Sequence, residues 1–237
     1  MTKRLFDALE VCQDKVARSA AMNMAIDEAL FESVLVPAIR FYRWQSPALS
    51  FGYFGRFADV VRYQHQRDLV RRWTGGGMVF HGEDLTYSIV IPATDAAFTE
   101  SSIAIYEKIH RALVDGLSET GQRAVVAGVG DPGQSSTIMA TPAGIPDAGY
   151  SCFEHPVRAD VTIDGRKVAG AAQRRTSRGL LQQGSIQGID VEDDLAQRFA
   201  EALSAARSDR ELEGEVLNRA RDLAERKFGT DFWMRKR

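Results

Sequence analysis

The amino-acid sequence predicts an α+β fold built on a mostly antiparallel sheet, and three observations support this prediction. Several short strand-like runs follow one another through tight turns, an order typical of antiparallel neighbours. Helical patterns surround these runs at the start, in the middle and at the end of the chain. The chain has 237 residues, of which 44% are hydrophobic, enough for a substantial core. This length suits one large domain or two small ones.

The first half of the chain is expected to hold one helix and four strands. The helix covers 22–36, where apolar residues recur every four positions until Pro37 ends the pattern. The expected strands are 39–44, 48–53, 69–72 and 85–91. A turn at Ser46-Pro47 joins the first two strands, the third runs into a row of glycines, and Pro92 stops the fourth.

The second half is expected to alternate helices with a hairpin. A helix over 106–117 ends at Gly121, and two amphipathic helices over 195–203 and 212–224 close the chain. The expected strands are 159–163, a return strand that carries Lys167 and Val168, and 180–186. Asp164-Gly165 is a strong turn signal between the first two of these strands.

Charge and composition exclude several classes of partner. Thirty basic and 32 acidic side chains give a formal net charge of −2, so no overall field favours nucleic acid or an anionic membrane. No stretch approaches the ~20 apolar residues of a membrane span, and the N-terminus lacks a signal-peptide pattern. Two cysteines, Cys12 and Cys152, do not form a disulfide framework. We therefore expect a cytoplasmic protein in a reducing compartment.

Residues 128–149 carry eight glycines and prolines, which deny the segment regular structure. A loop of this length is either a disordered surface insertion or a lid over a binding site. Because Cys152 follows it closely, we expect a lid that substrate orders.

Residues 71–81 combine two arginines with three consecutive glycines. Glycines let backbone N–H groups approach a ligand closely, and Arg72 supplies paired donors for phosphate or carboxylate. The alternative is a flexible turn between two strands, which is the commoner role of three glycines. The spacing fits neither a Walker loop nor a dinucleotide-binding motif. His81 closes the segment, and a lone histidine is more often structural than catalytic.

Cys152 and Lys167 are the candidates for covalent chemistry. Cys152 lies between Gly149 and Pro156, outside any periodic apolar run, although a single cysteine is usually an inert thiol. A nearby Lys167 ammonium would favour the nucleophilic thiolate. Lys167 could equally be a solvated strand residue. The small residues 170–172 that follow it favour a groove for an extended ligand. The nearby arginines 174, 175 and 178 indicate a solvated face, and such a face could meet an acidic protein partner.

These segments together resemble the biotin/lipoate protein ligase family, on its lipoate side. The matching segments are 23–30, 40–44, 49–53, 71–81 and 165–173. The resemblance covers most of the chain and is weakest over 122–148 and 205–220. Within the family, residues 152–156 (Cys-Phe-Glu-His-Pro) and 181–186 (Leu-Gln-Gln-Gly-Ser-Ile) look most like the cysteine-dependent octanoyltransferases.

The resemblance implies a mixed central sheet flanked by helices and a site with assigned roles. Cys152 would be the nucleophile that accepts the acyl group, and Lys167 would bind the acyl carbonyl. The implied substrate-binding residues are Arg72, Thr74, Gly75, Gly76, Gly77, Met78, Val79, Phe80, His81, Gly170 and Ala171. No metal is implied.

The implied activity is transfer of octanoyl from acyl carrier protein to a lysine of a lipoyl-domain protein, such as the glycine-cleavage H protein, without a cofactor. The first alternative is an ATP- and Mg-dependent lipoate ligase in which Cys152 is a bystander. The second is a non-catalytic homologue that binds the acyl group. Three departures from the transferase pattern keep these alternatives open: Gly77, Gly82 and Gln183, the last standing where a histidine is usual. We expect residues 1–237 to form a single catalytic domain without the accessory C-terminal domain of many ligases.

Overall fold

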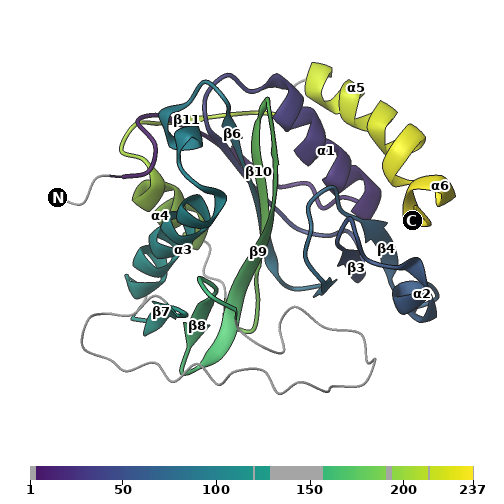
Figure 1. The fold of residues 1–237 in the computed structure, drawn as a ribbon, viewed down its shortest axis with the longest axis horizontal. Coiled ribbons are helices and arrows are strands. Elements are labelled where there is room, and N and C mark those ends of the chain that lie inside the picture. Colours follow the sequence, from purple (N-terminus) through teal and green to yellow (C-terminus); the bar gives the residue numbers. More distant parts are fainter. Residues whose placement is uncertain (1–3, 120, 129–156, 191–193, 213, 237) are drawn as a thin grey trace.

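The computed structural model describes residues 4–119, 121–128, 157–190, 194–212 and 214–236. Within these ranges the chain forms an eight-stranded sheet in the order β11-β1-β2-β6-β10-β9-β8-β7 (Figure 1). Its strands are β1 (Leu9–Gln13), β2 (Ala38–Tyr42), β6 (Leu85–Pro92), β7 (Ala124–Val126), β8 (Val161–Ile163), β9 (Arg166–Thr176), β10 (Gly179–Ile186) and β11 (Arg207–Asp209). Only the β11-β1 and β1-β2 pairs are parallel, so the predicted mixed, mostly antiparallel sheet is confirmed.

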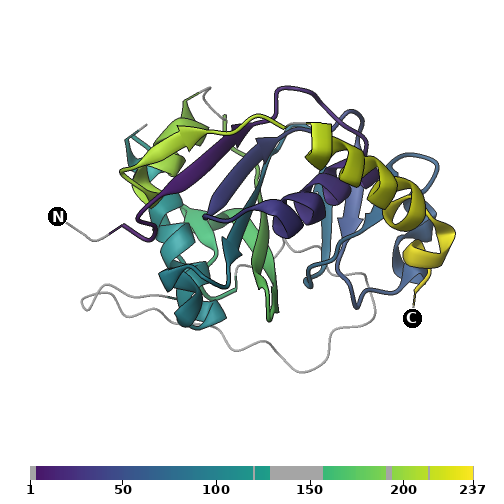
Figure 2. The ribbon, with the colours of Figure 1, turned by 90° about the horizontal axis from the view of Figure 1, so that it is seen from above.

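Helices cover both faces of this sheet (Figures 1 and 2). One face packs against α3 (Ser102–Ser118) and α4 (Leu195–Leu203), and the other against α1 (Ala20–Ser33), on which α5 (Gly214–Leu223) packs in turn. We call the second the α1 face. The short helices are α2 (Phe57–Val60) and α6 (Asp231–Met234), and a π-helical turn (Ala224–Phe228) links α5 to α6. None of the helices in the described ranges is long and apolar enough to cross a membrane.

The predicted connection between the strands at 39–44 and 48–53 is wrong in its pairing. Both strands exist, but β3 (Ala48–Phe51) belongs to a second sheet of three strands, in the order β4-β3-β5. Its neighbours are β4 (Asp68–Arg71), in parallel, and β5 (Met78–His81), in antiparallel orientation. The small sheet lies on the α1 side of the molecule, where β3 and β4 contact α1. This sheet presents the glycine segment 74–77 to the main sheet.

The predicted hairpin at Asp164-Gly165 is confirmed. Both residues have positive φ, 51° and 76°, which places them in the left-handed region that such a turn requires. The return strand β9 is much longer than β8 and runs on beside β10 to Thr176. Beyond Ala169, therefore, β9 pairs only with β10, and its other edge has no strand of the described ranges beside it.

Candidate functional site

Lys167 reaches the α1 face because β9 contains a bulge. Val161 pairs with Ala169 and Thr162 pairs with Lys167, so Val168 is an extra residue in the ladder. Val168 and Ala169 are consecutive, yet both are buried in the core beneath α3 and α4. Regular alternation resumes at Gly170, which points to the opposite face. The bulge thus puts Lys167 on the same face as Gly170, although the two residues are three apart.

The Lys167 side chain lies directly over Gly170. A Cβ added to Gly170 would lie 2.6 Å from Lys167 Nζ and 2.5 Å from its Cε, closer than real contacts allow. The ammonium forms an ion pair with Asp160, at 2.8 Å between Nζ and Oδ2. Both side chains are buried, with 5% and 0% of their surface exposed, so Lys167 is not the solvated strand lysine of the alternative interpretation.

Asp160 is itself held by two further groups. The Tyr106 hydroxyl donates to Asp160 Oδ1 at 2.7 Å, and the Val157 backbone N–H donates to Oδ2 at 2.8 Å. The same hydroxyl accepts a hydrogen bond from the Ala171 N–H at 2.9 Å, on the edge of β9 that β8 no longer covers. Burial and the adjacent carboxylate raise the pKa of Tyr106, so its hydroxyl stays protonated and continues to donate. Tyr106 and Asp160 thereby fix the direction of the Lys167 ammonium.

The glycine segment 74–77 packs against β9 two residues further along. A Cβ on Gly76 would lie 3.2 Å from the Ala172 methyl and 3.2 Å from Arg72 Nη2, and its φ of 84° also favours glycine. Gly75 faces open space, because a Cβ there would meet no described atom within 4 Å. The Thr74 carbonyl accepts the Tyr53 N–H at 2.8 Å, which ties the segment to the end of β3.

The structure therefore brings the two halves of the predicted site together. Lys167 lies over Gly170 and Gly76 lies against Ala172, on one face of one strand. Two residues along a strand span about 6.6 Å. Ala171, the third small residue, points the other way and packs on the core beneath α3.

Arg72 points into the protein and holds the glycine segment from behind. Its Nη2 donates to the carbonyls of Gly75 and Gly77, at 3.0 and 2.8 Å, and its Nη1 donates to Ser50 Oγ at 2.7 Å. Arg72 is only 5% exposed. These contacts make Arg72 a support of the segment, whereas the sequence predicted a donor to substrate.

His81 also lies behind the segment and is 5% exposed. Its Nε2 lies 2.7 Å from Ser50 Oγ and its Nδ1 lies 2.8 Å from Asp84 Oδ2, while the Trp44 ring stacks on it at 4.0 Å. Burial lowers the pKa of His81 below its ordinary value, although Asp84 opposes the shift. Burial alone would raise the pKa of Asp84, but hydrogen bonds from His81, Ser185 and the Gly82 N–H outweigh it and keep the carboxyl ionised.

The other predicted binding residues of this segment lie in β5. Met78 is buried in the small core between the second sheet and α2, with Leu49 and Phe51. Val79 is half-buried on the opposite side of the strand, and Phe80 is half-buried at the rim of a groove. That groove has a volume of about 350 Å³ and is lined by Phe80, Gly82, Glu83, Asp84, Ile186, Gln187, Gly188, Ile189 and Asp190. It opens where β5 and β10 end.

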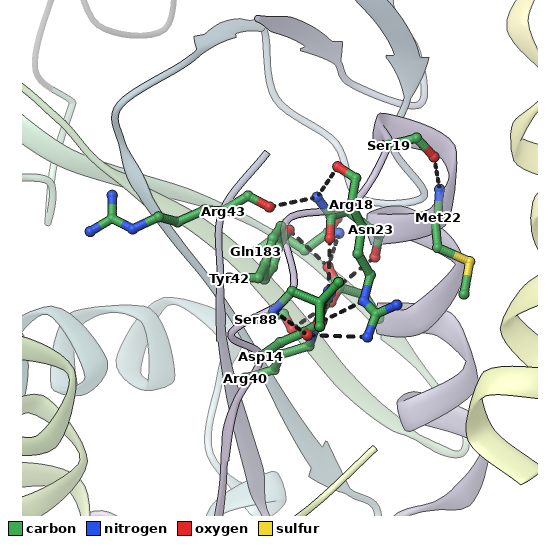
Figure 3. Close-up of polar contacts among 12 residues, drawn as sticks. Asp14, Arg18, Ser19, Met22, Asn23, Arg40, Tyr42, Arg43, Ser88 and Gln183 are labelled. Atoms are coloured by element: carbon green, nitrogen blue, oxygen red, sulfur yellow. Dashed lines mark hydrogen bonds and ion pairs between the residues drawn. The ribbon is translucent and has the colours of Figure 1, made fainter. Parts of the chain in front are cut away.

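Gln183 links the glycine segment to a buried charge network beneath α1. Figure 3 shows Gln183 within this network, near Arg40, Tyr42 and Ser88. Its Oε1 accepts from Thr74 Oγ1 at 2.8 Å, and its Nε2 donates to Asp27 Oδ2 at 2.7 Å. Asp27 is completely buried and also accepts from Arg40, Tyr42 and Ser88, on two strands of the main sheet. The residue that departs from the transferase pattern is thus fully engaged as a support.

The two cysteines differ in what the structure says of them. Cys152 and the predicted lid beyond Gly128 lie outside the described residues. Cys12 is buried in β1, and burial raises the pKa of its thiol to about 11, so it is not a nucleophile at neutral pH. Within the described ranges, no group of three or more His, Cys, Asp or Glu side chains could hold a metal ion.

Sequence reasoning missed the residues that support the site: Ser50, Asp84, Tyr106 and Asp160. Asp84 offered a signal, because a carboxylate three residues after His81 in a turn can fold back onto the imidazole. Asp160 and Tyr106 offered none, since the Tyr106 hydroxyl reaches Asp160 through tertiary packing at a sequence separation of 54 residues. Arg71, which the sequence grouped with Arg72, faces away from the site and binds carbonyls of α6.

In this α+β domain, with helices on both faces of a mixed sheet, a strand-borne lysine lies close to a glycine segment. The chain belongs to the family described as the lipoyl protein ligase A/B catalytic domain, whose family model matches residues 19–225.

Relatives and solved structures agree with this assignment. Octanoyltransferase LipM of Halalkalibacterium halodurans is 34% identical over 189 residues, which cover 76% of this chain and 66% of that protein. A LipM from Bacillus cereus is also 34% identical, but the chain spans only 61% of its length. Among solved structures, a lipoate-protein ligase A bound with ATP has a TM-score of 0.71 at 21% identity, covering 97% of this chain and 98% of that one.

A further structure is the bipartite lipoate protein ligase with its E2 lipoyl domain from Thermoplasma acidophilum. It has a TM-score of 0.68 at 20% identity and covers 96% of this chain and 95% of that one. At these identities the two structures establish the fold, and the fold is the one that the sequence predicted.

Proposed function

We propose that the protein is an octanoyltransferase that moves an octanoyl group from a carrier thioester to a lysine of a lipoyl-domain protein. The observation that carries the proposal is the position of the Lys167 ammonium beside the glycine segment on one face of β9, in a chain whose relatives are named octanoyltransferases. The substrate-binding residues of the proposed site are the backbone of 74–77 and the surface of Gly170 and Ala172.

In the first step of the proposed reaction, the Cys152 thiolate attacks the carbonyl carbon of the carrier thioester. A new C–S bond forms, the old C–S bond breaks, and the carrier thiolate leaves and takes a proton from solvent. In the second step, the neutral amine of the target lysine attacks the acyl-cysteine. A C–N bond forms, the Cys152 thiolate is released, and the amine gives its extra proton to solvent. Exchange of thioesters is nearly balanced in free energy, and amide formation makes the sequence favourable without ATP.

The Lys167 ammonium and the N–H groups of the glycine segment have the same task in both steps. Each step passes through a tetrahedral centre whose oxygen carries negative charge, and preorganised donors stabilise that charge. Asp160 supports this role because it holds the ammonium rigidly, at 2.8 Å. The first described residue after the cysteine segment, Val157, is bonded to the same carboxylate. Cys152 precedes this anchored residue by five positions in the sequence, which supports Cys152 as the nucleophile.

The surface beside the glycine segment supports an acidic carrier as partner. The Arg174 guanidinium lies 4.7 Å from the centre of the Trp73 ring and 5.1 Å from that of Tyr53, and the Lys236 ammonium lies 5.1 Å from that of Tyr53. No described carboxylate pairs with Arg174 or Lys236, so both charges are available to a partner. Trp73 directly precedes Thr74, so a carrier docked here would deliver its thioester to the loop.

Intact mass spectrometry after incubation with octanoyl-loaded acyl carrier protein tests the proposal. The native chain should gain one octanoyl group and then lose it to an apo lipoyl-domain protein. Cys152→Ala should gain none, whereas the matched variant Cys12→Ala should react like the native chain, because Cys12 is buried in β1. Transfer by Cys152→Ala at the native rate would exclude the acyl-cysteine mechanism.

An ATP-dependent lipoate ligase is the second candidate, favoured by the fold it shares with a ligase bound to ATP. In that reaction the glycine segment and Lys167 would hold the phosphate of lipoyl-AMP, with ATP and Mg as cofactors. Absence of an octanoyl adduct together with lipoate-dependent ATP–pyrophosphate exchange would establish the ligase. Absence of both reactions would leave a protein that only binds the acyl group.

A further inference from the structure

A continuous row of hydrogen bonds runs behind the glycine segment from Arg72 to Asp84. Arg72 Nη1 lies 2.7 Å from Ser50 Oγ, Ser50 Oγ lies 2.7 Å from His81 Nε2, and His81 Nδ1 lies 2.8 Å from Asp84 Oδ2. The row joins the residue after β4 to β3, β5 and the turn before β6. The proposed reaction assigns no role to Ser50 or Asp84, although both are nearly inaccessible to solvent.

The chemistry of the two ends gives the row a single direction. A guanidinium can only donate, so Ser50 Oγ accepts from Arg72, and its own proton is directed to His81 Nε2 when the neutral ring carries its proton on Nδ1. Asp84 accepts from the hydroxyls of Thr86 and Ser185, at 2.8 and 2.6 Å, and therefore acts as a carboxylate. His81 must then carry its proton on Nδ1 and donate it to Asp84. Every bond in the row is satisfied by this one tautomer.

The row ends on the two carbonyls that orient the loop. Arg72 Nη2 donates to the carbonyl oxygens of Gly75 and Gly77. Because a trans peptide points its N–H opposite to its C=O, fixing the Gly75 carbonyl against Arg72 turns the Gly76 N–H away from it. The position of the guanidinium therefore decides where that N–H points. Ser50 sets the position of the guanidinium from its other side.

The far end of the row also touches the lysine half of the site. The Ser185 hydroxyl that donates to Asp84 belongs to the residue that pairs with Gly170 across β10 and β9. Lys167 lies over that same glycine. Asp84 thus lies between the Lys167 half of the site and the glycine segment. Ser50, His81 and Asp84 are each at most 6% exposed. Such burial suits residues that act through others.

We propose that Ser50, His81 and Asp84 are positioning residues that hold Arg72 and so fix the glycine segment 75–77 in the orientation that acyl transfer requires. The inference rests on the proposed transferase function for its kinetic consequence alone. A misplaced donor raises the barrier of the chemical step more than it weakens binding, and an error of about 1 Å can cost roughly a hundredfold in rate.

Ser50→Ala removes the one hydroxyl that joins Arg72 to His81. We expect its kcat for octanoyl transfer to fall tenfold to a hundredfold (roughly the cost of a misplaced oxyanion donor), with KM for the octanoyl carrier close to native. The matched control is Ser204→Ala, which deletes an equally buried hydroxyl that bonds the Ala206 carbonyl far from the loop. Equal kcat values for the two variants would overturn the proposal.

Nuclear magnetic resonance supplies a readout that does not depend on activity. Long-range ¹H–¹⁵N correlation should show the His81 proton on Nδ1, and the amide resonances of Gly75, Gly76 and Gly77 should move in Ser50→Ala but not in Ser204→Ala. Unmoved glycine amides, or a proton on Nε2, would refute the positioning role even if the native chain shows no transferase activity. If Ser50→Ala fails to fold, the same measurements are made on His81→Asn. The new amide can still donate to Asp84 but offers no acceptor at the position of Nε2 for Ser50.

Discussion

Lys167 owes its orientation to what lies under and beside it. The absence of a side chain at Gly170 leaves the space that the lysine stem occupies, and Asp160 holds the ammonium in place. An ammonium on a flexible four-carbon stem is a poor catalytic donor unless its rotamers are restricted, because ordering it at each turnover costs entropy. The glycine and the buried carboxylate remove that cost before substrate arrives.

Gly170→Ala should separate activity from stability. The new methyl would collide with the Lys167 Cε and Nζ, the flexible end of a side chain, so the lysine can move away at a small cost in folding free energy. We expect the thermal midpoint to stay near the native value while kcat for acyl transfer falls roughly tenfold or more, since a displaced donor raises the barrier. Steady-state kinetics and differential scanning calorimetry measure the two effects.

Gly214→Ala is the control, because a Cβ there meets no described atom within 4 Å and the residue begins α5, far from the site. Native kcat in Gly170→Ala would show that the position of the ammonium is not critical.

At the level of single residues, the sequence pointed to the motif residues of the candidate site but not to the buried residues that contact them. The three glycines and Lys167 were found because a motif is local. Asp160 and Ser50 were missed because buried partners are chosen by tertiary packing, and their residue types are common on any surface. The burial of Arg72 and His81, which were expected to contact substrate, was not predicted because burial is not visible in a short motif.

Among the elements, the sequence predicted the long periodic ones well. The helices α1, α3 and α4 and the strands β6 and β10 appear within a few residues of their expected bounds. The wrong pairing expected for the strands β2 and β3 has a physical reason. β2 already has neighbours on both edges, β1 and β6, so no edge is free for β3. The missed strand β1 is what fills that edge, and its parallel pairing leaves no turn signal in the sequence.

The C-terminal helix α6 is fastened to β4 by one arginine. Arg71 is 1% exposed and donates to the carbonyls of Tyr53, Gly55, Trp233 and Met234, while the Trp233 indole N–H donates back to the Arg71 carbonyl. We expect Arg71→Lys to lower the free energy of unfolding by about 3 kcal/mol, because an ammonium cannot replace a planar fork that reaches four carbonyls. Urea denaturation followed by tryptophan fluorescence measures it.

The control for this change is Arg226→Lys, which alters an exposed arginine paired with Asp222 and should shift stability by less than about 1 kcal/mol. Because Arg71 faces away from the site, the folded Arg71→Lys variant should keep native kcat. A variant that stays stable but loses activity would place Arg71 in the site after all.

For the molecule as a whole, a buried histidine makes stability depend on pH. His110 donates from Nδ1 to the Ala159 carbonyl and accepts the Tyr87 hydroxyl at Nε2, at 2.5 and 2.9 Å. Burial lowers the pKa of His110 to about 4 from its ordinary 6.5. Between these values the unfolded chain binds a proton that the folded chain rejects, so stability falls as pH falls through this window. The expected loss is about 2 kcal/mol between pH 7 and pH 5.

Urea midpoints at pH 7 and pH 5 measure this slope. His110→Gln should be less stable at pH 7 but should show a smaller loss on acidification, because an amide does not titrate. Exposed His65 provides the comparison, and His65→Gln should keep the native slope. The buried-histidine explanation fails if His110→Gln loses as much stability between the two pH values as the native chain.

The same contrast between an amide and an imidazole applies to the glycine segment. One support, through Arg72 and Ser50, ends on the imidazole of His81, which has two possible charge states. The other, through Thr74, ends on Gln183, which has one. The Gln183 amide still connects Thr74 to Asp27, so α1 and the loop are joined mechanically. A chain with histidine at this position would carry titratable groups on both sides of the loop. Here the group that contacts Thr74 cannot be protonated, so acid acts on the glycine segment through His81 and Ser50 and not through the Gln183 amide.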